Sequence, residues 1–115
     1  AYRQTAGDIA AMAGADLILW NGLSLEAQMA AFPPDPRRSR REVAVAEGVP
    51  PDRLLADEAY PEQFDPHVWM DPALWVHVIS AILDALSDLA PDRVAHFVAA
   101  AEALTLEAVA LDLYA

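Results

Sequence analysis

The sequence contains no cysteine and no lysine among its 115 residues. The lack of cysteine excludes disulfides, thiolate metal sites and cysteine nucleophiles. Any metal site must therefore use histidine, carboxylate, carbonyl or water ligands, which suit manganese, zinc or iron better than copper(I) or an iron–sulfur cluster. No uninterrupted apolar run reaches the roughly 18 residues that a membrane-spanning helix needs, which predicts a soluble chain.

Positive charge is also scarce. Seven arginines stand against 18 aspartates and glutamates, so the formal net charge is −11. This charge repels a phosphate backbone unless the basic residues are strongly clustered. They gather in one place only, at Arg37, Arg38, Arg40 and Arg41. Such a short cluster is more typical of a solvated face than of an anion site, so we predict no nucleic-acid partner.

Helix and strand signals alternate along the first half of the chain. We predict a helix over about residues 6–14, a strand over 16–20, a helix over 24–32 and a strand over 42–47. Thr5 and Asp8 have the spacing of a helix-capping box. The run at 16–20 is apolar without alternation, which indicates a strand covered on both faces of a parallel sheet. This order of elements predicts an α/β fold.

The second half of the chain is predicted to be helical after a long loop. Residues 48–66 hold several prolines, and a connection of this length in a compact domain is often functional. A helix with a wide apolar face begins at Pro72. A second helix begins at Pro91 and runs to the end of the sequence, because proline is favoured in the first turn of a helix.

The stretch at 65–72, DPHVWMDP, holds the most informative histidine. His67 lies at the end of the long loop, where backbone can be shaped around a ligand. Asp65 or Asp71 could accept the ring N–H that is not bound to metal, which is the usual way a metal-binding imidazole is oriented. The alternative is a histidine that caps the following helix, with Trp69 as plain core. Spacing alone favours this alternative, because one histidine does not hold a metal.

Other candidate site residues are weaker. Asn21 and Gly22 follow the first predicted strand, and no phosphate-binding glycine motif accompanies them. Loops at the carboxyl ends of parallel strands bind ligands in α/β folds, so Asn21, Glu26 and the His67 loop could converge there. His77 and His96 lie on the two predicted long helices and are interpreted as functionless. No serine or threonine stands in a nucleophile motif, which leaves a hydrolase little support.

Three stretches together resemble a known family: YRQTAGDI at 2–9, DLILWNGLSLE at 16–26 and, most specifically, FDPHVWMDPALW at 64–75. The chain resembles the N-terminal lobe of the metal-binding solute-binding proteins that serve manganese, zinc and iron ABC transporters in bacteria. The resemblance implies a parallel-sheet α/β sandwich lobe over residues 1–90, with its first strand upstream. Residues 91–115 would be the start of a long helix connecting this lobe to a C-terminal lobe downstream.

The resemblance also implies a metal site between the two lobes. Two histidines of the N-terminal lobe and residues of the C-terminal lobe hold the ion in this family. His67 matches the second of these histidines, whereas the first would fall immediately upstream of residue 1. Asp65, Asp71 and Glu26 are expected to support the site, and Trp69 and Trp75 to pack its loop against the helix. The 115-residue stretch alone is expected to bind metal weakly or not at all.

The function implied is that of a receptor without enzymatic activity, periplasmic or extracellular or anchored by lipid. It would capture a divalent manganese or zinc ion and deliver it to the permease of an ABC importer. Residues 48–64 lack histidine, which leans toward manganese or a broader specificity. The alternative is a surface adhesin or interaction protein that acts independently of metal, and a metal-dependent hydrolase comes third. A sheet that lacks a strand has an unpaired edge, so self-association of the stretch is also expected.

Overall fold

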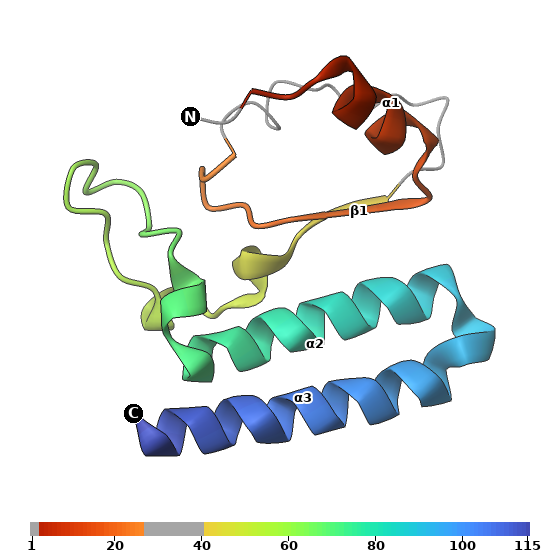
Figure 1. Ribbon diagram of the computed structural model, residues 1–115. Helices are drawn as coiled ribbons and strands as arrows, with labels where there is room; N and C mark the ends of the chain where they lie inside the picture. The colour runs from red at the N-terminus through yellow and green to blue at the C-terminus, as the bar shows by residue number, and fades with distance from the viewer. Residues whose placement is uncertain (1–2, 27–40) are drawn as a thin grey trace.

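The computed structural model describes residues 3–26 and 41–115. Within these ranges the elements are α1 (Ala6–Gly14), β1 (Leu17–Trp20), β2 (Arg41–Ala44), α2 (Pro72–Leu89) and α3 (Val94–Tyr114). Short 3-10 turns lie at Val45–Gly48, Pro51–Arg53, Val68–Met70 and Pro91–Arg93. Figure 1 shows α1, the two strands, α2 and α3 stacked in that order, with α2 and α3 running side by side as a hairpin. The predicted α/β fold class is confirmed.

Helix α1 begins with the predicted capping box. The Thr5 hydroxyl accepts a hydrogen bond from the Asp8 backbone N–H at 3.2 Å, and the Asp8 carboxylate accepts one from the Thr5 N–H at 2.8 Å. These bonds satisfy backbone donors that the first turn of a helix leaves without partners. The sequence therefore determines the start of this helix locally.

The two strands pair in parallel, as predicted, with Leu17 opposite Arg41 and Trp20 opposite Ala44. Two details of the prediction were wrong. Strand β1 is not covered on both faces, because Ile18 is buried whereas Leu19 is 39% exposed. The second strand ends at Ala44 rather than 47, because the chain then turns inward over Val45–Gly48 and buries Val45 in the core.

The loop after β1 does not start the helix predicted from Ser24. Residues 23–26 form a turn, and Gly22, Leu23 and Ser24 all have positive φ angles, of 83°, 52° and 66°. Ser24 was predicted to cap this helix, but Leu25 and Glu26, which would form its first turn, belong to the turn instead. The rest of that predicted helix, and three of the four clustered arginines, lie outside the described residues. The fourth, Arg41, pairs with Asp88 of α2 at 2.8 Å.

The core lies between the strand ends and α2. It unites the turn after β2, the segment following His67 and one face of α2, and its buried members are Val45, Ala46, Val49, Val68, Leu74 and Val78. Asp71 caps α2 by accepting hydrogen bonds from the N–H groups of Ala73 at 2.8 Å and Leu74 at 3.3 Å. The predicted start of this helix at Pro72 is confirmed. The core thus places the beginning of α2, and the loop before it, against the carboxyl ends of the strands.

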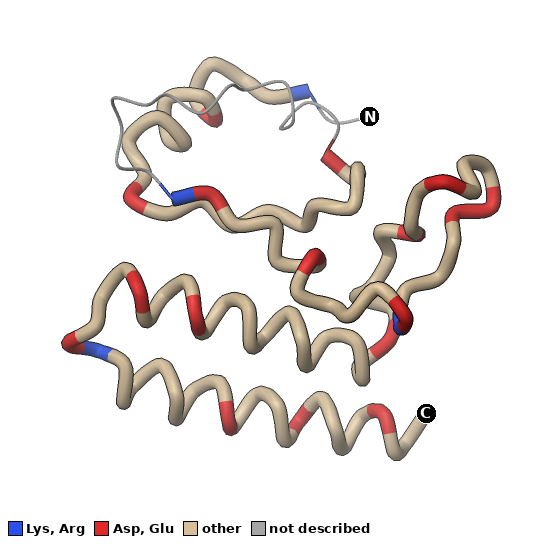
Figure 2. The backbone as a smooth tube through the Cα atoms, turned by 180° about the vertical axis from the view of Figure 1, so that it is seen from behind, with Lys and Arg blue, Asp and Glu red and all other residues tan. Residues whose placement is uncertain are grey.

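Two described helices are long and apolar enough to cross a membrane by length and composition, Pro72–Leu89 and Pro91–Tyr114, with mean hydropathies of 1.3 and 1.6. Helix α2 meets this criterion as the core helix of the fold. Helix α3 contains Glu102, Glu107 and Asp112, whose carboxylates would be costly in lipid. Figure 2 shows acidic positions spread along this helix. The apolar side chains of α3 are therefore better explained by contacts with protein.

Candidate functional site

His67 lies where the long loop joins the core. The next residue, Val68, is only 2% exposed and belongs to the core cluster. The His67 side chain itself is 57% exposed. The backbone at this position is thus anchored by its neighbour while the imidazole faces outward, which is a suitable arrangement for a ligand.

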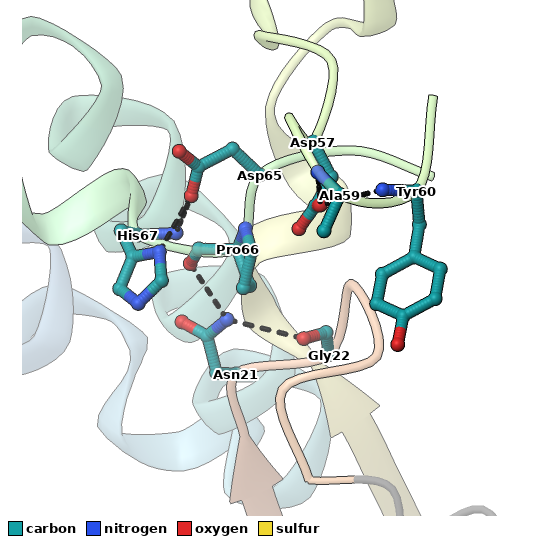
Figure 3. A network of polar contacts seen from close by, with 8 residues as sticks. All are labelled: Asn21, Gly22, Asp57, Ala59, Tyr60, Asp65, Pro66 and His67. Atoms are coloured by element: carbon teal, nitrogen blue, oxygen red, sulfur yellow. Dashed lines mark hydrogen bonds and ion pairs between the residues drawn. The ribbon is translucent and has the colours of Figure 1, made fainter. Parts of the chain in front are cut away.

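Asp65 holds the imidazole of His67 through a single carboxylate oxygen. Its Oδ1 accepts a hydrogen bond from the His67 backbone N–H at 2.9 Å and lies 2.6 Å from the ring Nδ1 (Figure 3). The backbone hydrogen bond from His67, followed by the bond from its ring, lowers the pKa of the Asp65 carboxyl below its ordinary value. Asp65 is therefore ionised at neutral pH and can accept a hydrogen bond from Nδ1–H. In that tautomer Nε2 carries the lone pair that a metal ion binds.

Asn21 contacts the His67 loop at the carboxyl ends of the strands, whereas Glu26 contacts the backbone of Asn21 and Gly22 and not that loop. The Asn21 side-chain amide donates to the carbonyl oxygen of Pro66 at 3.1 Å, across 45 positions of sequence (Figure 3). The Glu26 carboxylate accepts from the backbone N–H groups of Asn21 at 2.8 Å and Gly22 at 3.0 Å. Strand order predicted that Asn21 would lie near the His67 loop, but it could not predict the contact with Pro66.

Asp71 and Trp69 have roles that differ from those expected. Asp71, one of two candidates to orient His67, caps α2. Trp69 is 44% exposed and meets the His67 ring edge-on, with centroids 5.1 Å apart, so it is neither plain core nor the anchor of the loop. Val68 is that anchor, whereas Trp75 packs partly buried against the core, as expected. In the sequence, the only indication that Val68 anchors the loop is that it is an apolar residue next to the histidine.

Over residues 3–26 and 41–115, no three histidine, aspartate or glutamate side chains come close enough together to hold a metal ion. His77 is half-buried on α2 and His96 is exposed on α3. His67 with Asp65 is therefore a single oriented ligand position, and a metal bound there would need further ligands.

Comparisons with known proteins agree with this description. Residues 1–115 match the family ZnuA, described as "Zinc-uptake complex component A periplasmic". The chain belongs to the ZnuA family. The solved structure of the periplasmic zinc-binding protein TroA from Treponema pallidum superposes with a TM-score of 0.87 at 39% identity, over 98% of this chain and 40% of TroA.

Relatives of this chain also include MntA, named for manganese, and Lmb, named for laminin binding. By sequence, TroA is 40% identical over 98% of this chain and 36% of its own length, and the manganese-binding lipoprotein MntA of Bacillus subtilis is 32% identical over 80% of this chain and 30% of its own. The laminin-binding protein Lmb of Streptococcus agalactiae, described as having adhesin and metal-transporting activity, matches at a TM-score of 0.76 and 26% identity, over 96% of this chain and 40% of Lmb. The chain thus spans about a third of the length of its curated relatives.

Proposed function

We propose that the full-length protein is an extracytoplasmic receptor that captures Zn²⁺ or Mn²⁺ and delivers it to the permease of an ABC importer. The imidazole of His67, oriented by Asp65, carries this proposal. Its Nε2 would be one ligand of the ion; imidazole suits Zn²⁺, and Mn²⁺ would need oxygen ligands beside it. A binding role without catalysis accords with the family's description as an uptake component.

We further propose that residues 1–90 belong to one lobe and that 91–115 are the helix leading to a second. Helix α3 supports this division, because apolar side chains remain exposed along it: Leu104 at 48%, Leu106 at 71%, Val109 at 44%, Leu111 at 55% and Leu113 at 83%. These residues lie on opposite sides of the helix, and a helix that is apolar on several sides is typically buried against protein. The other ligands of the ion would come from outside residues 1–115, so this stretch alone would bind metal weakly.

His67 alone does not decide between zinc and manganese. The relatives of this chain include proteins named for each metal, TroA for zinc and MntA for manganese. Zinc binds a given site of nitrogen and oxygen ligands more tightly than manganese does. Selection of manganese would therefore depend on the geometry set by the remaining ligands.

A metal titration of the full-length protein tests the proposed function. After removal of metal by a chelator, Zn²⁺ or Mn²⁺ at a hundredfold excess over its dissociation constant is expected to stabilise the fold by about 2.7 kcal/mol, because only the folded state holds the site. Thermal unfolding with and without each ion measures this effect. An unchanged melting temperature with both ions, together with undiminished binding of the metal-free protein to laminin, would favour the adhesin alternative that Lmb suggests.

Alanine substitutions separate the two aspartates that flank His67. Asp65→Ala is expected to weaken zinc binding about 10- to 100-fold, since it removes the partner that orients a metal-binding imidazole. Asp71→Ala removes the cap of α2 and is expected to lower the free energy of unfolding by about 1 kcal/mol without a comparable loss of affinity. Zinc competition and urea unfolding on both variants measure the difference. Equal losses of affinity would contradict the assignment of Asp65.

A further inference from the structure

We propose that Asn21, itself held by Glu26, is a positioning residue for His67, given the metal-binding role proposed above for that imidazole. Neither residue would touch the ion. Together they would fix the peptide that precedes His67, so that the ring reaches the ion without first being ordered by it.

The loop that carries Asn21 adopts a backbone that must be held in place. Leu23 and Ser24 have φ angles of 52° and 66°, which cost roughly 1–2 kcal/mol each for residues with a side chain. The Glu26 carboxylate offsets this cost by accepting the N–H groups of Asn21 and Gly22. Strained segments fixed in this way occur at functional sites more often than elsewhere. Glu26 therefore fixes the backbone of Asn21, and with it the position from which the Asn21 side chain extends.

Asn21 is tied to three separate parts of the fold. Its N–H donates to Glu26, and its carbonyl oxygen accepts from Ala46 of the core at 2.9 Å. Its side-chain Nδ2 donates to the carbonyl oxygens of Gly22 and Pro66, both at 3.1 Å. An amide nitrogen has two hydrogens, and both are used. The position of the donor that faces Pro66 is thus set by the strand loop and the core.

The bond to Pro66 orients the group that meets the metal. The Pro66 carbonyl and the His67 N–H belong to one planar peptide, so fixing the carbonyl also fixes the direction of the N–H. That N–H donates to Asp65 Oδ1, the same atom that lies 2.6 Å from the ring Nδ1. Because 57% of the His67 side chain is exposed, packing does little to hold the ring, and these hydrogen bonds do most of the positioning.

The test uses the full-length protein, Zn²⁺ in competition with a chromophoric chelator, and Co²⁺ as a probe of ligand geometry. Asn21→Ala is expected to weaken zinc binding about 10- to 100-fold, the usual effect of losing outer support for a ligand, and to change the cobalt absorption spectrum. Glu26→Gln, which leaves one backbone N–H without its acceptor, is expected to act in the same direction with a smaller loss. A merely structural role would lower the melting temperature and leave the cobalt spectrum unchanged.

Asp57→Ala is the matched control. Like Glu26, the Asp57 carboxylate accepts hydrogen bonds from two backbone N–H groups, those of Ala59 at 2.8 Å and Tyr60 at 2.9 Å. Asp57 lies in the long loop that leads to His67, but its carboxylate has no bond to Pro66 or His67 (Figure 3). This variant is expected to keep the native affinity and cobalt spectrum. Native affinity and spectrum in Asn21→Ala, or in Glu26→Gln should Asn21→Ala not fold, would overturn the positioning role. Native affinity in His67→Ala would instead overturn the proposed function.

Discussion

Replacement of His67 by alanine is expected to weaken zinc binding by the full-length protein about 10²- to 10³-fold. Zinc bound by about four protein ligands gains roughly 10–16 kcal/mol, so one ligand contributes on the order of 3 kcal/mol. The metal-free protein should unfold at nearly the same temperature as before, because the His67 side chain is more than half exposed and adds little to the core. Zinc competition and thermal unfolding of the metal-free protein measure the two quantities.

His77→Ala and His96→Ala are the controls for this substitution. Each removes an imidazole from a long helix, His77 from a half-buried position on α2 and His96 from an exposed position on α3. Both variants should bind zinc as the unmodified protein does. If all three alanine variants bind equally well, His67 is not a ligand and the exposed imidazole has another purpose. If His77→Ala alone loses affinity, the site lies on α2.

Elements whose signals are local could be predicted from the sequence. The capping box of Thr5 and Asp8 acts within three residues, so the start of α1 was predicted correctly. Proline at the first position of α2 likewise marked the start of that helix, whereas Pro91 begins a 3-10 turn and α3 begins three residues later, at Val94. The parallel pairing of β1 and β2 followed from the order of elements. The fold class was therefore accessible without any tertiary contact.

Features that depend on contacts distant in sequence could not be predicted. The hydrogen bond from Asn21 to Pro66 joins two loops, and the sequence of neither loop indicates that they are in contact. Val68 rather than Trp69 is buried because the 3-10 turn at Val68–Met70 directs the smaller residue to the core. The left-handed residues after Gly22 were missed since Leu23 and Ser24 rarely adopt positive φ. At the candidate site, tertiary structure overrides local preference.

Gly22→Ala is expected to lower the free energy of unfolding by roughly 2–5 kcal/mol, the sum of a backbone cost and an overpacking cost. The φ angle of Gly22 is 83°, in the region that disfavours any residue with a Cβ atom. An added Cβ would also lie 2.7 Å from the Cβ of Ala44, a methyl group that cannot rotate away because Ala44 is paired with Trp20 in the sheet. The loop must therefore shift. Urea unfolding of the full-length protein measures the loss.

The same shift should reach the candidate site, and a second glycine separates this effect from the general effect of adding a methyl group. Gly22 donates to Glu26 and accepts from Asn21, so Gly22→Ala is also expected to weaken zinc binding. Gly14 ends helix α1, and a Cβ there would meet nothing within 4 Å. Gly14→Ala is therefore expected to stabilise the protein by about 0.5–1 kcal/mol, because alanine loses less backbone entropy in a helix, and to leave zinc affinity unchanged. If the two stability changes have opposite signs and only Gly22→Ala loses zinc affinity, the backbone after β1 is linked to the site. If Gly22→Ala is destabilised but keeps its native zinc affinity, the loop serves the fold alone.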